Sequence, residues 1–259
     1  MPLLAWIILF SLIGGLLSVA AAAIFLVFPD RVREALLPHF VSFAIGALLG
    51  AAFLALIPHT LSEAYAIEHH QLGLTLLVGL LSFFLMEKLV LWRHCHEHNC
   101  AAHELTELQH RHAAGSLILI GDATHNLVDG ILIAAAFMTD FHLGVITSLA
   151  VAAHEIPQEV GDFAILLHSG FSRSKAFVYN ILASITTIIG ALIAYYSLND
   201  AQAIVPYILA IAASSFIYIA VADLIPGLHK RAEFSQTVRQ ITLIITGILV
   251  VYFAHTTLH

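Results

Sequence analysis

Residues 115–138 read GSLILIGDATHNLVDGILIAAAFM, and residues 143–168 read LGVITSLAVAAHEIPQEVGDFAILLH. Each stretch is long enough for a membrane-spanning helix, which needs about 20 predominantly apolar residues. Polar and ionisable side chains nevertheless interrupt the middle of both stretches. Charged groups at bilayer depth are costly and persist mainly where they face a bundle interior, a partner or an ion. Because both stretches carry such groups at matching depth, we expect one shared polar site.

The spacing of these polar residues indicates a metal site. His125 and Asp129 lie four residues apart, and so do His154 and Gln158, so each pair projects from a single helical face. Imidazole, carboxylate and amide groups are ligand types of zinc, iron and manganese. With the residues one position beside these faces, the predicted metal ligands are His125, Asn126, Asp129, His154, Glu155 and Gln158.

Five further residues are candidate auxiliary metal ligands. Glu159 and Asp162 continue the polar run of residues 143–168. His59 and Glu63 lie four residues apart at the outer end of another apolar stretch and indicate a site where a metal arrives. Asp223 lies in a later apolar stretch and indicates a ligand on the exit side. Hydrogen-bonded polar packing without a metal is the alternative for each of them.

Composition predicts an integral membrane protein. Of the 259 residues, 60% are hydrophobic and only 10% are charged, whereas soluble domains carry about 25% charged residues. The net charge of −7 argues against nucleic acid as a partner. The 17 His residues outnumber the 10 Lys and Arg residues, which favours transition-metal handling. The first apolar stretch lacks a basic leader and a cleavage site, so we expect a retained helix rather than a signal peptide.

Eight apolar stretches predict an all-α bundle of eight transmembrane helices that forms one domain over residues 1–259. Leu-Ile-Pro occurs near the ends of the second and seventh stretches, at 56–58 and 224–226. Since these two helices would run in opposite directions, the match suggests an inverted repeat, a recurring transporter architecture. The expected helices are 3–28, 38–58, 72–92, 115–138, 143–168, 174–197, 203–227 and 237–257.

Basic residues predict the orientation of the bundle. With this helix order, every Lys and Arg falls on one side of the membrane, which the positive-inside rule makes cytoplasmic. Both termini are then expected outside the cytoplasm, in a plasma or inner membrane. The basic residues are Arg31, Arg33, Lys88, Arg93, Arg111, Arg173, Lys175, Lys230, Arg231 and Arg239.

The longest expected loop, residues 93–114, is rich in His and Cys. On the cytoplasmic side a disulfide between its two cysteines is not expected, and thiolate and imidazole groups are zinc ligands. The spacing matches no strict zinc-finger pattern, so we predict a labile loop site, with a solvated polar loop as the alternative. Its candidate ligands are His94, Cys95, His96, His98 and Cys100.

The stretches HNLVDG at 125–130 and HEIPQEVGDFAILL at 154–167 resemble the ZIP (Zrt-, Irt-like protein) metal transporter family. The resemblance is greatest to the branch with a His-Glu-x-Pro-His-Glu-x-Gly-Asp motif in its fifth helix. It implies movement of zinc, or of iron, manganese or cadmium, into the cytoplasm through a site on the fourth and fifth helices. It also implies that His125, Asp129, His154 and Gln158 hold the first metal.

A second metal is implied at Asn126, Glu155 and shared ligands. Two departures from the family bear on the site: the branch has His where this chain has Gln158, and some members have a Glu near Thr186 and Thr187. We therefore expect Gln158 to affect metal preference. Whether the site holds one metal ion or two is left open.

Two other functions are compatible with these residues. A selective divalent-metal channel would use the same ligands, because residue types do not report saturation. An intramembrane zinc hydrolase is a weaker alternative, since the motif H-E-x-x-H would need His at the position of Gln158. The expected partners are divalent metal ions and the lipid bilayer, and a homodimer is left open.

Overall fold

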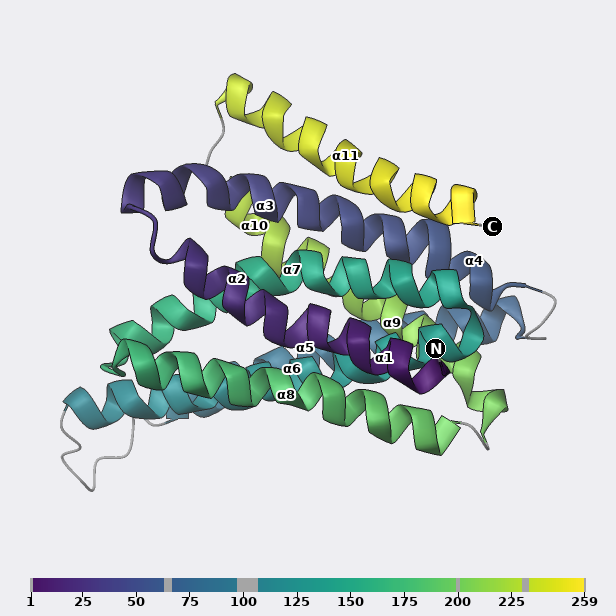
Figure 1. Cartoon of the computed structure of the whole chain (residues 1–259), viewed down its shortest axis with the longest axis horizontal. Coiled ribbons are helices and arrows are strands. Elements are labelled where there is room, and N and C mark those ends of the chain that lie inside the picture. Colours follow the sequence, from purple (N-terminus) through teal and green to yellow (C-terminus); the bar gives the residue numbers. More distant parts are fainter. Residues whose placement is uncertain (1, 63–66, 97–106, 199–200, 230–232, 259) are drawn as a thin grey trace.

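The computed structural model describes residues 2–62, 67–96, 107–198, 201–229 and 233–258. These residues form an all-helical bundle, which confirms the predicted fold class (Figure 1). The segments are α1 (Leu3–Leu12), η1 (Ile13–Leu17), α2 (Ser18–Phe25), α3 (Asp30–Gly50), η2 (Ala51–Leu56), α4 (Ile57–Thr60), α5 (His69–His96), α6 (Glu107–Thr139), α7 (Phe141–His168), α8 (Arg173–Leu198), η5 (Gln202–Ile204), α9 (Val205–Tyr218), η6 (Ile219–Leu224), α10 (Ile225–His229) and α11 (Phe234–Leu258).

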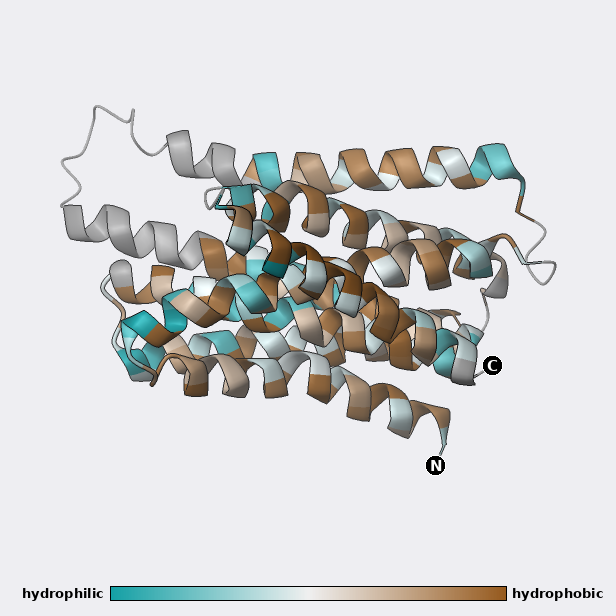
Figure 2. Cartoon of the chain, turned by 90° about the horizontal axis from the view of Figure 1, so that it is seen from above, coloured by the Kyte–Doolittle hydropathy of each residue, from teal (hydrophilic) through white to brown (hydrophobic). Residues whose placement is uncertain are grey.

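In the described part of the chain, seven helices are long and apolar enough to cross a membrane. They correspond to seven of the eight predicted spans. The remaining one, α7, has 28 residues, but the polar residues in its second half lower its hydropathy. Figure 2 shows the result: hydrophobic residues cover most of the helix lengths, while hydrophilic residues gather at the ends and in the middle of the bundle.

Two predicted boundaries were wrong. The second span begins at Asp30 rather than at residue 38, because the helix accepts Pro38 in its interior. Pro38 removes one backbone donor, while Pro29 and the acidic Asp30 favour a helix start one turn after the first span ends. The His/Cys-rich connection is also shorter than 93–114, since α5 continues to His96 and α6 begins at Glu107.

Successive long segments run in opposite directions, so their connections alternate between two ends of the bundle (Figure 1). Both termini lie at one end, which we call the termini end. We call the other the basic end, because Arg31 and Arg33 lie in the first turn of α3 there, and Arg173 and Lys175 lie in the first turn of α8. This clustering agrees with the predicted helix order.

We group the helices into two sets, and the glycine contacts between helices fall inside them: they join η1 to α7 and α8, and α6 to α7 and α8, in the first set, and α3 to α11 and α5 to α9 in the second. The site set comprises α1–η1–α2, α6, α7 and α8, and the frame set comprises α3–η2–α4, α5, α9–η6–α10 and α11. A Cβ added at Gly130 would lie 1.8 Å from the Thr187 carbonyl oxygen, which joins α6 to α8. One added at Gly46 would lie 2.0 Å from the Ile244 carbonyl oxygen, which joins α3 to α11. Small residues permit such approaches in lipid.

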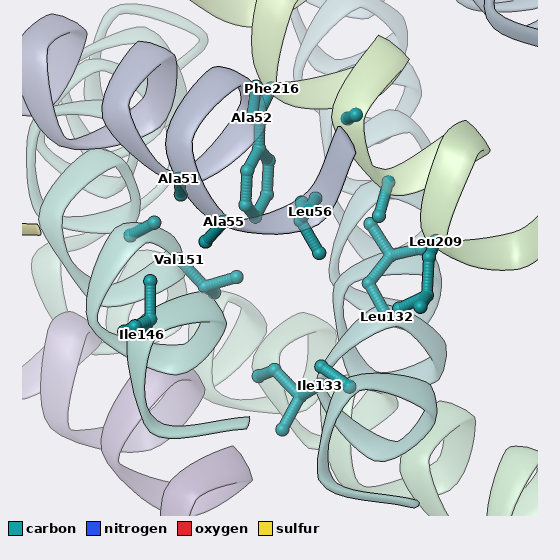
Figure 3. Close-up of a cluster of buried hydrophobic side chains, with 14 of the residues drawn as sticks. Ala51, Ala52, Ala55, Leu56, Leu132, Ile133, Ile146, Val151, Leu209 and Phe216 are labelled. Atoms are coloured by element: carbon teal, nitrogen blue, oxygen red, sulfur yellow. The ribbon is translucent and has the colours of Figure 1, made fainter. Parts of the chain in front are cut away.

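The two sets meet through an apolar core on the termini side of the bundle centre. Figure 3 shows Ala51, Ala55 and Leu56 of η2 beside side chains of α6, α7 and α9. Phe216 of α9 is fully buried within this cluster. In this core the contacts across the boundary are made by alkyl and aromatic groups.

The Leu-Ile-Pro repeat has a structural counterpart. In each copy a six-residue π-helical segment, η2 or η6, ends at the Leu. The next amide bonds five residues back, from Ile57 to the Ala52 carbonyl and from Ile225 to the Ala220 carbonyl. Proline two positions after each segment cannot donate to the ordinary helical acceptor, and π-turns often mark functional sites. Since the two helices run in opposite directions (Figure 1), this local geometry agrees with an inverted repeat.

The glycine contacts predict a large difference between two similar substitutions. Gly190→Ala would place a Cβ 2.0 Å from the Leu127 carbonyl oxygen and force α6 and α8 apart, so we expect a loss of about 1–3 kcal/mol. Gly161→Ala, which meets nothing within 4 Å, should be neutral or stabilising. Thermal unfolding of the purified variants in one detergent measures both. Equal melting temperatures would contradict the close approach of α6 and α8.

Candidate metal centre

A one-residue connection sets the register of the two helices that carry the polar cluster. α6 ends at Thr139 and α7 begins at Phe141, so only Asp140 separates them. The Asp140 carboxylate caps α7 by accepting from the backbone amides of His142 at 2.8 Å and Leu143 at 2.9 Å. His125 and Glu155 are equally distant from Asp140 in sequence. Antiparallel packing of the two helices therefore brings them to the same depth.

Four side chains converge between these helices. The Nε2 atoms of His125 and His154 are 3.2 Å apart, and Asp129 Oδ2 lies 3.5 Å from the first and 3.3 Å from the second. Glu155 Oε1 lies 3.6 Å from His125 Nε2. Tetrahedral zinc with ligands at 2.0–2.1 Å keeps ligand atoms about 3.3 Å apart. The cluster thus has the dimensions of a zinc site.

The orientation of His154 exposes a lone pair to this cluster. Its Nδ1 lies 2.9 Å from the Ala150 carbonyl oxygen. Because a carbonyl can only accept, Nδ1 carries the proton and donates, which leaves Nε2 of the neutral ring as the ligand atom. The ring also lies against the Phe216 ring, with a centroid distance of 6.1 Å. These two contacts hold the imidazole before any metal arrives.

The carboxylates of the cluster lack ordinary partners. Both oxygens of Asp129 and both of Glu155 are buried without a hydrogen bond, and each residue has zero solvent exposure. A buried carboxylate is strongly unfavourable unless it is paired or coordinates a cation. The residues present therefore fit a divalent metal ion.

The Asn126 side chain lies between α6 and α8. Its amide nitrogen donates to Asp122 Oδ1 at 2.8 Å, and its amide oxygen accepts from Thr187 Oγ1 at 2.7 Å. The oxygen has a second lone pair, so ligation of a second metal by Asn126 stays a prediction. Thr187, near the position where some ZIP members have Glu, instead helps to tie the two helices together.

A second group of carboxylates adjoins the first. Oxygen atoms of Asp122, Glu155 and Glu159 lie close enough to share a cation, and Ser184 Oγ donates to Glu159 at 2.9 Å. Glu159 was predicted as an auxiliary ligand, whereas Asp122 was not among the predicted ligands and Ser184 was not predicted as a neighbour of the site. The spacing of Asp122 and Asn126, four residues apart on one face of α6, is a signal that could have identified Asp122.

A cavity of about 450 Å³ leads to the cluster from the basic end. It reaches His125, Gln158 and Asp162, and it is lined by residues of α3, α5, α6, α7, α9 and η6, most of which lie on the basic-end side of the cluster. His125 is 9% exposed, whereas His154 is fully buried. The apolar core shown in Figure 3 lies on the opposite side. This cavity therefore approaches the cluster from the basic side.

The cavity also brings together residues that sequence reasoning had not connected. Asp223 of η6 and Glu87 of α5 both line it, and the exit-side role of Asp223 stays a prediction. The Tyr218 hydroxyl donates a hydrogen bond to the Glu87 carboxylate. Glu87 and Tyr218 were missed, because each lies in an apolar helix with no periodic polar partner.

The remaining predicted ligands lie elsewhere. His59 is in α4 at the termini end, where its ring is 6.1 Å from that of His255, and it does not belong to the central cluster. Glu63, His98 and Cys100 fall outside the described residues. His94, Cys95 and His96 lie in the last turn of α5, whose side chains there are also outside the described part. The loop site and the His59–Glu63 pair remain predictions.

The chain is similar to known proteins over most of its length. The profile of a family described as "ZIP Zinc transporter" matches residues 92–255. "Zinc transporter ZIP13" of Pongo abelii is 31% identical over 83% of this chain and 65% of the relative. "Zinc transporter zipt-7.2" of Caenorhabditis elegans is 39% identical over 52% of this chain and 30% of the relative. This chain therefore spans about a third to two thirds of the length of these two relatives.

The geometry predicts which His controls metal binding. His154→Ala removes one of four convergent ligands, so zinc affinity at the cluster should fall at least about tenfold. His39→Ala is the matched control, because His39 lies on α3 and its ring contacts the Ala35 carbonyl at 2.7 Å. Calorimetric titration of zinc into both purified variants provides the measurement. Unchanged zinc affinity in His154→Ala would remove this residue from the site.

Proposed function

Because the chain belongs to the family of ZIP zinc transporters, we propose that it moves zinc across a membrane through the cluster of His125, Asp129, His154 and Glu155. One observation carries this proposal: two fully buried carboxylates without hydrogen bonds face two imidazoles at zinc-ligand spacing. Such a cluster in the middle of apolar helices is strongly unfavourable without a cation. Zinc is the proposed substrate, with iron(II), manganese and cadmium as competing substrates.

The cavity supports release toward the basic end. Four carboxylate residues line it between the cluster and that end: Asp122, Asp162, Asp223 and Glu87. A cleft lined by one sign of charge raises the local concentration of the opposite ion, so these groups favour the passage of a divalent cation. The positive-inside rule assigns the basic end to the cytoplasm. We therefore propose uptake into the cytoplasm of a cell with this protein in its plasma or inner membrane, with both termini outside.

Transport requires access from the termini end as well, and the packing supports a way to obtain it. The glycine contacts lie inside the site set and inside two helix pairs of the frame set, α3–α11 and α5–α9, while apolar side chains meet across the boundary between the sets in the core of Figure 3. Alkyl contacts are non-directional and can be exchanged with little penalty. We propose that the site set moves against the frame set to open the opposite side. A channel would not need this movement.

Metal uptake into proteoliposomes tests the proposal. The purified protein should take up radiolabelled zinc in a saturable way without an added energy source. Glu155→Gln, which removes one ligand charge, should reduce the initial rate to less than about a tenth, while Glu34→Gln on the exposed part of α3 should leave it unchanged. A rate that rises linearly with zinc concentration would favour the channel. Equal rates for the two variants would place the site elsewhere.

The position of Gln158 predicts a change in selectivity. Gln158 lines the cavity beside His125 and Pro157, one turn after His154. An amide oxygen is a harder ligand than imidazole, so Gln158→His should favour zinc over manganese and iron(II). Tighter binding should also slow release, so the maximal zinc rate should fall while the half-saturating concentration falls. Competition between zinc and manganese in wild-type and variant proteoliposomes measures this, and identical competition curves would exclude Gln158 from ligation.

A further inference from the structure

A second cavity lies at the basic end, apart from the metal cluster. It has a volume of about 390 Å³ and is enclosed by α2, α3, α7 and α8. Much of its wall is apolar, with Leu26, Phe163 and Phe177 among its lining residues, and Arg33 and Arg173 contribute the charge. None of its lining residues is acidic. The metal transport proposed above makes no use of this cavity.

The two arginines give the cavity the chemistry of a phosphate site. Arg33 donates to the Asp30 carboxylate through Nη2, but its Nε is buried without a hydrogen-bond partner. Arg173 begins α8 and is exposed, and the first backbone amides of a helix favour an anion. Guanidinium groups bind phosphate through several donors at once. An anion at this position would satisfy the Arg33 donor.

The apolar wall decides which anion fits. A free phosphate ion gains nothing from the aromatic rings of Phe163 and Phe177, whereas the glycerol and acyl chains of a phospholipid would cover them. The cavity lies at the ends of membrane-spanning helices, where headgroups are found. Basic pockets between helices on the cytoplasmic side are known binding places for anionic headgroups. We propose that this cavity binds one anionic phospholipid, with its phosphate between Arg33 and Arg173.

The location gives such a lipid a role in transport. Arg33 belongs to α3 of the frame set, while Arg173 belongs to α8 of the site set. A phosphate held by both would connect the two sets at the basic end and stabilise the conformation described here. This consequence rests on the proposed transport function. The binding of the lipid does not, so the two can be tested separately.

Native mass spectrometry tests the binding directly. Protein is extracted from vesicles of mixed phosphatidylcholine and phosphatidylglycerol, and the retained phosphatidylglycerol is counted. The double variant Arg33→Gln/Arg173→Gln should retain at least about tenfold less phosphatidylglycerol than the wild type. The matched control Arg31→Gln/Lys175→Gln removes two exposed charges from the same end but none from the cavity. It should retain phosphatidylglycerol like the wild type.

Two further measurements separate lipid from simpler explanations. Ala23→Phe fills the apolar part of the cavity and leaves both arginines in place, so it should also lose the lipid while its melting temperature confirms folding. Inorganic phosphate should not displace phosphatidylglycerol from the wild type. Equal loss in the two double variants, retention in Ala23→Phe, or displacement by phosphate would each overturn the proposal. A folded Arg33→Gln/Arg173→Gln variant that keeps the lipid would likewise refute the lipid site, while zinc uptake by the wild type tests transport separately.

Discussion

The burial of Asp129 and Glu155 without hydrogen-bond partners is the constraint on which this bundle depends. Two carboxylates in an interior of low dielectric repel each other and have lost their water. The fold tolerates them because His125 and His154 face them and because a cation can reach them. A structural zinc cage would have the same ligands but no route outward. Here the cavity on the basic side offers such a route. The unfavourable burial of the two carboxylates therefore favours binding of a cation that can also leave.

Most of the fold could be predicted from the sequence, because apolar stretches of about 20 residues admit few arrangements in a membrane. The convergence of the polar cluster was predictable for a similar reason: i,i+4 spacing on two successive helices limits where His125, Asp129 and His154 can point. The hydrogen bonds that α8 makes to the cluster were harder to predict from the sequence. Ser184 and Thr187 look like ordinary small helix residues, and their hydrogen bonds to Glu159 and Asn126 depend on the crossing of helices distant in sequence.

The proline and glycine residues also show which features could not be predicted from the sequence. Pro38 was expected to begin a helix and instead lies inside one, since the preceding residues can extend the helix toward the basic end. The Leu-Ile-Pro match was a weak sequence signal, yet it marks two π-helical segments in equivalent positions. Glycines in the spans were expected to permit close packing. The helix that each glycine approaches could emerge only from the three-dimensional arrangement.

The single residue between α6 and α7 has a consequence for how this architecture can vary. Asp140 caps α7 and leaves no slack between the two ligand-bearing helices. One inserted residue there would have to be absorbed by unwinding a helix end, or else would rotate one helix by about 100° against the other and turn its ligands away from their partners. The register of α6 against α7 is therefore fixed by this one-residue connection.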